Sequence, residues 1–326
     1  MSVEKTILLT VNYGGKPLEI VRDLLPEGFA LVTMTTTAQE ELEQAAAGAD
    51  YILASGNLKI SRKVLAAATH LKMVQRLGVG LDSLDREALK EYGIPVYVNR
   101  GVNAGSVAEH ALMFILASLR RLTTINANTK AGIWKKQEQG VMTRELRSQT
   151  VGIIGFGNIG KRTAALLRPF GCRVFYYDMF RADERDEERY GVKYLPLDEL
   201  FARADVLSLH CPLTDETKEI ICRRNLEKMK DGVVIVNTSR GGLINEEDLL
   251  SALDNGKVGQ AALDVFQSEP LKNTELAEHE KVICTPHIAG NTYDSFREMM
   301  RCAFESIRLF DEGRLQEIEN NRIALW

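Results

Sequence analysis

Short apolar runs alternate with amphipathic segments along most of the chain, and this alternation predicts an α/β fold. The runs are rich in Val, Ile and Leu, as in strands that a parallel sheet buries on both faces. Predicted strands occupy residues 6–11, 29–34, 51–54, 72–77, 95–98, 151–154, 173–177, 206–209, 233–237, 260–264 and 281–284. Predicted helices occupy residues 18–25, 38–47, 61–68, 85–92, 106–121, 198–202, 226–230, 246–255 and 293–313. We therefore expect parallel sheets with helices on their faces.

Residues 151–178 combine a strand, a glycine turn, a helix and a second strand. Gly155, Gly157 and Gly160 follow the first strand at G-x-G-x-x-G spacing. These glycines would permit a sharp turn, let the backbone approach a pyrophosphate and let the helix pack on the sheet. The second strand ends in Asp178, close to the spacing at which an acid accepts hydrogen bonds from an adenosine ribose. The pattern predicts a dinucleotide site and favours NAD over NADP. An S-adenosylmethionine or other nucleotide site on the same unit is the alternative.

Size and charge narrow the possible partners. The 326 residues are enough for about two domains. A net charge of -4 and scattered basic pairs argue against binding of nucleic acid. We expect no signal peptide before the first strand. The longest apolar run, residues 107–119, is too short to span a bilayer and predicts a helix buried on nearly all sides, between domains or between subunits.

The cysteines indicate the compartment. The chain has five, an odd number, and none is in C-x-x-C spacing. They mostly lie in apolar or strand-like contexts, so we expect buried free thiols and a cytoplasmic protein.

The first hundred residues form strands and helices but contain no glycine turn that binds phosphate, so we expect a separate domain there. The polar segment 100–105 suits a hinge, and the last helix is expected to return to the first domain. The charged run 181–189 is expected to be solvated surface.

Three ionisable residues follow predicted strands of the second half: Arg240, Glu269 and His287. Parallel sheets bind ligands at the carboxyl ends of their strands, so the three can converge beside the dinucleotide. Oxidising a carbinol with NAD requires a base for the hydroxyl proton, and His titrates near neutral pH. A carboxylate would orient the ring and raise its pKa, while a guanidinium would hold a substrate carboxylate.

Structural explanations compete with these roles. A lone histidine is more often structural, and we interpret His70, His110, His210 and His279 in that way. Glu269 could simply end a strand, and Arg240 could serve a turn, but three such residues after one dinucleotide fingerprint favour catalysis. The sequence has no H-E-x-x-H, no G-x-S-x-G and no cluster with metal-ligand spacing, so no metal is expected.

Consecutive motifs resemble those of the D-isomer specific 2-hydroxyacid dehydrogenases. They are GVGLDSLD, SVAEHALMFIL, GFGNIG with YYD, HCPLTDET, VNTSRGGLINEEDL, ALDVFQSEP and TPHIAG. The resemblance implies two doubly wound parallel-sheet domains, with a Rossmann NAD-binding domain at residues 102–291 inserted in a flavodoxin-like substrate domain at residues 1–101 and 292–326. It also implies a homodimer formed through the NAD-binding domain by helix 106–121 and the segment near Trp134.

The resemblance also implies roles for single residues. Arg240 matches the family's substrate-binding arginine, Glu269 the carboxylate of its His-Glu pair, and His287 its acid/base. Val79 and Gly80 match the backbone that receives the substrate carboxylate. The implied NAD-binding set is Gly155, Phe156, Gly157, Asn158, Ile159, Gly160, Asp178, Cys211, Pro212, Thr217, Thr238, Ser239, Arg240, Asp264, His287 and Gly290, of which Asp264 would meet the nicotinamide carboxamide.

Residue 55 bears on the substrate. Ser55 stands where phosphoglycerate dehydrogenases of the family carry an arginine that helps to hold their phosphorylated substrate. A hydroxyl cannot neutralise charge, although Lys59 lies nearby in sequence. We therefore expect an unphosphorylated 2-oxo acid such as glyoxylate or hydroxypyruvate. A phosphoglycerate dehydrogenase is the alternative, and an NADH-sensing protein of the corepressor type is an alternative of another class.

Overall fold

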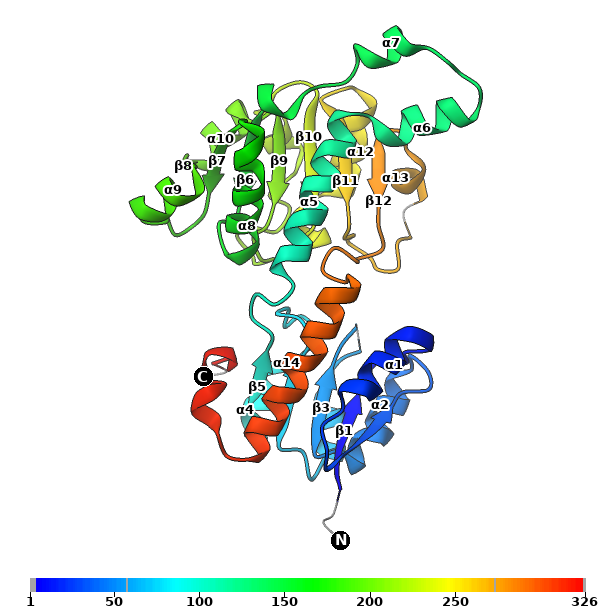
Figure 1. The fold of residues 1–326 in the computed structure, drawn as a ribbon, viewed down its shortest axis with the longest axis vertical. Coiled ribbons are helices and arrows are strands. Elements are labelled where there is room, and N and C mark those ends of the chain that lie inside the picture. Colours follow the sequence, from blue (N-terminus) through cyan, green and yellow to red (C-terminus); the bar gives the residue numbers. More distant parts are fainter. Residues whose placement is uncertain (1–3, 57, 273, 325–326) are drawn as a thin grey trace. The chain divides into compact units, whose positions relative to one another are not determined.

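The chain folds into two units, and the computed structural model describes residues 4–56, 58–272 and 274–324. Unit 1 combines Met1–Asn103 with Tyr293–Trp326, and unit 2 is Ala104–Thr292 (Figure 1). Unit 1 is thus built from both ends of the chain.

Unit 1 is a five-stranded parallel sheet in the order β2-β1-β3-β4-β5. This is the flavodoxin-like order of doubly wound folds. The strands are β1 (Lys5–Leu9), β2 (Phe29–Thr33), β3 (Tyr51–Ala54), β4 (Met73–Arg76) and β5 (Val96–Val98). One face packs against α1 (Gly15–Leu24) and α14 (Tyr293–Asp311), and the other against α2 (Gln39–Ala45), α3 (Arg62–Ala67) and α4 (Arg86–Glu91).

Helix α14 belongs to unit 1 because its apolar stripe completes that core. Phe296, Met300, Phe304 and Ile307 recur at helical spacing and are buried. They join the cluster formed by the β1 and β3 side chains.

Unit 2 is a seven-stranded parallel sheet in the order β12-β11-β10-β9-β6-β7-β8. Counted from β6, this is the dinucleotide-binding order 3-2-1-4-5-6 with β12 added at the edge. The strands are β6 (Thr150–Ile154), β7 (Arg173–Tyr177), β8 (Lys193–Tyr194), β9 (Val206–Leu209), β10 (Val233–Asn237), β11 (Val258–Leu263) and β12 (Val282–Cys284). Both predicted sheets are therefore present, and both are parallel.

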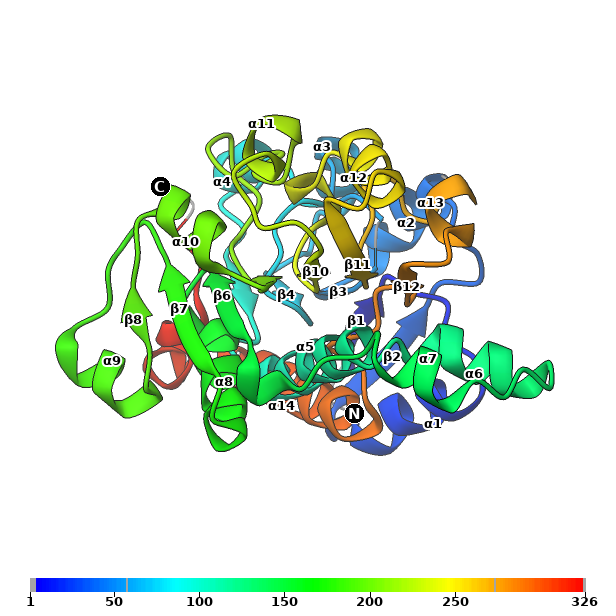
Figure 2. The same cartoon turned by 90° about the horizontal axis from the view of Figure 1, so that it is seen from above.

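Helices cover both faces of this sheet. One face packs against α5 (Ala104–Leu119) and α8 (Asn158–Leu167), which lie side by side (Figure 2). The other packs against α10 (Leu197–Arg203), α11 (Arg223–Leu226) and α12 (Glu246–Asp254). The remaining helices are α6 (Leu122–Lys130), α7 (Lys136–Gly140), α9 (Glu184–Tyr190) and α13 (Thr274–Glu278).

Three predictions need correction. Helix α11 begins at Arg223, earlier than predicted, because the Asp248 carboxylate accepts the Arg223 N–H at 2.8 Å. Helix α5 is not buried on nearly all sides in the single chain, since Met113 is 47% exposed. The five cysteines are free thiols, but only Cys211 is buried, and Cys284 is exposed at the end of edge strand β12.

Candidate active site

The carboxyl ends of the unit 2 strands bring the predicted residues of that unit to one edge. Every pairing in this sheet is parallel, so each strand ends on the same side. The order of the strands reverses between β6 and β9, which is where such sheets bind ligands. The residues that follow strand ends are Gly155 after β6, Asp178 after β7, Cys211 after β9, Arg240 after β10, Asp264 after β11 and His287 after β12.

The glycine turn after β6 is set by sterics. Gly155 has φ +96°, and a Cβ there would lie 2.4 Å from the Cys211 nitrogen. A Cβ on Gly160 would lie 2.1 Å from the Gly155 oxygen. By contrast, a Cβ on Gly157 would meet nothing within 4 Å. Gly155 and Gly160 therefore serve packing, while Gly157 borders open space that a ligand can approach.

The start of α8 is suited to a diphosphate. Gly157 is its N-cap, no side chain caps it, and its first turn has no acidic residue. The first N–H groups of a helix lack intrahelical partners and favour an anion. These residues fit a dinucleotide pyrophosphate, which backbone groups would hold because the Phe156 side chain is buried in the core.

Asp178 shapes the same turn. Its carboxylate accepts the backbone N–H of Phe156 at 2.7 Å and that of Phe180 at 3.0 Å. Each oxygen retains a second lone pair that a ribose hydroxyl can use. The nearby Arg181 is held in a two-bond ion pair with Glu187, at 2.9 and 3.2 Å.

Side chains tie the neighbouring loops of the edge together. The Ser239 hydroxyl donates to the Cys211 carbonyl at 2.6 Å, and the Thr217 hydroxyl donates to the Pro212 carbonyl at 2.6 Å. Thr238 is buried at the end of β10. The loop after β10 is therefore hydrogen-bonded to the loop after β9.

His287 and Glu269 form a hydrogen-bonded ion pair. His287 Nδ1 lies 2.8 Å from Glu269 Oε2, and the His287 side chain is 51% exposed. The hydrogen bond and negative charge of Glu269 raise the pKa of His287, against the effect of burial. Burial acts to raise the pKa of Glu269, but the bond to His287 and its charge outweigh it, so this pKa is lowered. The pair leaves Nε2 of the imidazole as the second ring nitrogen that can exchange a proton.

Arg240 lies close enough to influence both members of this pair. Its charge acts to lower the pKa of Glu269 and that of His287. Asn237 fixes the loop, because its side chain accepts the Ser239 N–H at 3.0 Å and donates to the Arg240 carbonyl at 2.9 Å. Arg240, Glu269 and His287 thus meet at the same edge of the sheet.

Asp264 is fully buried beneath the His287 loop. It accepts the backbone N–H of Ile288 and that of Ala289, each at 2.8 Å, and its carbonyl accepts the His287 N–H at 2.7 Å. His287 itself has φ +55°, a conformation that is uncommon for a residue with a side chain. Asp264 therefore holds the loop in the shape that presents His287.

In unit 1, Val79 and Gly80 lie on the loop after β4. Arg76 holds this loop, because its Nε donates to the Gly80 carbonyl at 3.0 Å and its Nη1 to the Ser83 hydroxyl at 2.9 Å. Val79 is 50% exposed.

Ser55 follows β3, which pairs with β4, so it shares the same sheet edge. Its hydroxyl lies 3.2 Å from the Tyr13 hydroxyl.

Three polar residues with structural links to the site were not among the predicted site residues. They are Asn237, Thr285 and His110. Asn237 and His110 each interrupt an apolar run, which is the one signal the sequence offers. Thr285 carries no signal of its own, because its contacts come from distant parts of the chain.

Comparison with known proteins identifies the family. The NAD binding domain of the D-isomer specific 2-hydroxyacid dehydrogenases matches residues 112–289. The chain belongs to this family. It is accordingly an NAD-dependent oxidoreductase, and the fit of the glycine turn and of Asp178 to a dinucleotide agrees with that cofactor.

Individual relatives differ in substrate. The chain is 38% identical over 271 residues to hydroxypyruvate reductase of Thermotoga maritima, covering 82% of this chain and 87% of that protein. It is 39% identical over 286 residues to D-3-phosphoglycerate dehydrogenase of Mycobacterium leprae, covering 85% of this chain but only 54% of that protein. The crystal structure of D-lactate dehydrogenase from Aquifex aeolicus, complexed with NAD and lactic acid, superposes with a TM-score of 0.85 at 30% identity and covers 98% and 99% of the two chains.

Two further findings concern the described residues alone. No helix in residues 4–56, 58–272 and 274–324 is long and apolar enough to cross a membrane. Within the same ranges, no three His, Cys, Asp or Glu side chains are grouped as metal ligands would be.

Proposed function

We propose that the protein interconverts a small unphosphorylated 2-oxo acid and its D-2-hydroxy acid with NAD(H), with glyoxylate or hydroxypyruvate as the 2-oxo acid. The observation that carries this proposal is the 2.8 Å pair of His287 and Glu269 beside Arg240. Bound NADH supplies the hydride in the direction of reduction.

Each member of the site has its own task in this proposal. Protonated His287 donates a proton from Nε2 to the oxygen that becomes the hydroxyl, and takes it back in oxidation. Glu269 keeps the ring oriented and favours its protonated form. The Arg240 guanidinium holds the substrate carboxylate and polarises the carbonyl. Val79 and Gly80 of unit 1 are the backbone that the family resemblance assigns to substrate binding. Unit 1 is in this view the substrate domain.

The absence of a phosphate on the substrate is inferred from residue 55 in unit 1. The Ser55 hydroxyl already interacts with the Tyr13 hydroxyl, and neither group carries a positive charge. A substrate phosphate near Ser55 would lack the charge-assisted hydrogen bonds that an arginine at this position would donate. Such bonds are roughly twice as strong as neutral ones. We therefore assign an unphosphorylated substrate and keep the phosphoglycerate dehydrogenase reaction as the second candidate, since a relative of that activity is similarly close.

A substrate panel tests the proposal. Glyoxylate, hydroxypyruvate, pyruvate and longer 2-oxo acids are each offered with NADH, and hydroxypyruvate is compared directly with its phosphate ester by kcat/KM. We expect turnover of glyoxylate or hydroxypyruvate and poor use of the ester. A clear preference for the ester would reverse the substrate assignment. Tight NADH binding without turnover of any acid would instead favour a sensor of the corepressor type.

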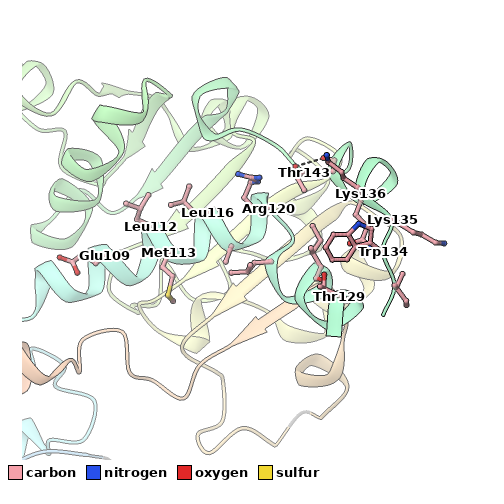
Figure 3. Close-up of a pocket in the computed structure, with 16 residues that line it drawn as sticks. Glu109, Leu112, Met113, Leu116, Arg120, Thr129, Trp134, Lys135, Lys136 and Thr143 are labelled. Atoms are coloured by element: carbon pink, nitrogen blue, oxygen red, sulfur yellow. Dashed lines mark hydrogen bonds between the residues drawn. The ribbon is translucent and has the colours of Figure 1, made fainter. Parts of the chain in front are cut away.

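We also propose a homodimer formed through unit 2. Residues 120–145 include α6 and α7 but no buried side chain, although isolated short helices are marginal in water. With α5 they border an open apolar groove of about 860 Å³ (Figure 3). Met113 and Trp134, which is 81% exposed, point into this region (Figure 3). A second copy of the same surface would cover both, as the family resemblance implies.

The free thiols support a reducing compartment, so we assign the protein to the cytoplasm.

A further inference from the structure

A chain of hydrogen bonds within unit 2 joins helix α5 to the loop that carries His287. His110 on α5 places Nε2 3.1 Å from Thr285 Oγ1. The Thr285 hydroxyl in turn lies 2.5 Å from Asp264 Oδ1. Asp264 holds the His287 loop through the three backbone N–H bonds described above. The contact from α5 thus reaches the proposed acid/base through two intermediate groups.

The direction of each bond follows from the groups involved. A carboxylate can only accept, so the Thr285 hydrogen points to Asp264. Thr285 Oγ1 can then offer only a lone pair to His110, and the hydrogen of that bond must be on Nε2. Burial lowers the pKa of His110, although the charge of Asp264, 3.9 Å away, acts in the opposite sense. His110 is therefore a neutral donor at neutral pH.

The strained loop needs such support. His287 has φ +55°, and a conformation of this kind persists only where the surrounding structure fixes it. Asp264 helps to fix it, together with the Thr285 carbonyl, which accepts the His287 N–H at 3.1 Å. Among the described residues, the Ile288 N–H and the Thr285 hydroxyl donate to Asp264 Oδ1. A hydroxyl can rotate, so a donor that occupies its lone pair also determines where its hydrogen points.

We infer that His110 is a positioning residue, which orients the Thr285 hydroxyl toward Asp264 and so fixes the loop that presents His287 to Glu269. The inference rests on the proposed acid/base role of His287. The competing explanation is packing, because the His110 ring also contacts buried Phe114 edge-on, with centroids 4.5 Å apart.

A set of variants separates the two explanations. His110→Phe keeps a ring against Phe114 but removes the donor, whereas His110→Gln keeps an N–H near the position of Nε2. Thr285→Val removes the hydroxyl at constant shape, and Thr285→Ser retains it. The control is Ser118→Ala on the same helix, since the buried Ser118 hydroxyl has no hydrogen-bond partner among the described residues. Folding of each variant is checked by circular dichroism and thermal unfolding.

The readouts are kcat for reduction of glyoxylate or hydroxypyruvate, the alkaline limb of its pH profile, and the titration of His287 followed by NMR. We expect His110→Phe to lower kcat by roughly three- to tenfold, as a lost neutral hydrogen bond would. The alkaline limb and the NMR titration of His287 should both move to lower pH, because Glu269 then supports the protonated ring less well. His110→Gln and Thr285→Ser should restore most of the wild-type behaviour, and Ser118→Ala should match wild type.

A double variant gives the sharpest test. If His110 acts through Thr285, His110→Phe combined with Thr285→Val should be no slower than Thr285→Val alone. Losses that multiply in the double variant, or an unchanged His287 titration in His110→Phe, would overturn the inference. If His110→Phe does not fold, the Thr285→Val and Thr285→Ser pair still decides, since equal His287 titrations in the two would also refute it. Failure of the proposed function is a separate result, in which His287→Gln itself retains activity.

Discussion

The choice between NADH and NADPH should depend on Asp178. A 2′-phosphate on the ribose would approach a carboxylate that already accepts two backbone N–H groups, at 2.7 and 3.0 Å. Two unit charges 4 Å apart repel by about 1 kcal/mol in water and about 4 kcal/mol near a protein surface. Asp178 is half-buried, so we take about 2 kcal/mol for the repulsion and add about 1 kcal/mol for the lost ribose hydrogen bond. The sum of about 3 kcal/mol predicts that kcat/KM for NADH exceeds that for NADPH by roughly a hundredfold.

Arg181 is the cation best placed in sequence to weaken this preference, but Glu187 holds it in a bidentate ion pair. Two variants test this account. Asp178→Asn removes the charge while retaining an acceptor for the backbone, and the preference for NADH should fall to about tenfold or less. Glu187→Gln releases Arg181 and should improve kcat/KM with NADPH. The control is Glu188→Gln, which makes the same change of charge at an exposed position of the same helix.

The assay is the initial rate of 2-oxo acid reduction over a range of each dinucleotide, with absorbance of the reduced cofactor as the signal. Comparable kcat/KM for NADH and NADPH in the wild type would refute the electrostatic argument. An equal gain with NADPH in Glu187→Gln and Glu188→Gln would show that net charge, rather than the release of Arg181, is responsible.

Four further predictions concern catalysis, acid stability and assembly. His287→Gln should lower kcat by roughly 10² to 10⁴ with little change in NADH affinity, and a loss below tenfold would remove it from the role of proton donor. Because Glu269 raises the pKa of His287, kcat for reduction should fall as the pH rises through that raised pKa. Glu269→Gln should move this alkaline limb of the pH profile to lower pH, and an unchanged limb would mean that the two groups are uncoupled. Burial lowers the pKa of His210 to about 4, so the unfolded state binds the proton first as the pH falls. The free energy of unfolding should therefore fall between pH 6.5 and 4, by at most about 3 kcal/mol. Urea unfolding should show a weaker pH dependence of this free energy in His210→Asn than in the wild type, and equal pH dependence in the two would contradict His210 as its origin. Met113→Glu with Trp134→Ala should yield monomers in sedimentation experiments, whereas a wild type that sediments as a monomer would exclude the proposed dimer.

The sequence anticipated the strands far better than the charged helices. Buried parallel strands are continuous apolar runs, so β3, β7, β9 and β10 begin and end where the pattern predicts. Helix α9 was missed because its residues, ERDEERY, bury no side chain and show no apolar periodicity. The Asp183 side chain is its N-cap and accepts the Asp186 N–H. This local signal is hard to recognise in the sequence, because Asp183 stands in a run of charged residues.

The sequence predicted correctly that the main site residues of unit 2 lie at one edge of the sheet. That prediction depends only on where each strand ends, because the carboxyl ends of parallel strands share one edge. Contacts between side chains could not be foreseen in the same way. His110 and Thr285 meet across 175 positions of sequence, and His110 was interpreted as a structural histidine. A hydrogen bond of this kind depends on how α5 packs against the sheet, which no local pattern encodes.

The construction of unit 1 from both ends of the chain affects how the protein emerges from the ribosome. Its five strands are synthesised first, yet α14, which covers one face of their sheet, follows only after all of unit 2. At about 5 to 20 residues per second, that delay lasts roughly ten to forty seconds. During this interval the face that contains Ile7, Leu9 and Tyr51 lacks part of its cover, and nascent chains are expected to depend on chaperones there. A chain that stops at residue 292 should accordingly bind a hydrophobic dye while still binding NADH, and the absence of dye binding would show that the sheet protects itself without α14.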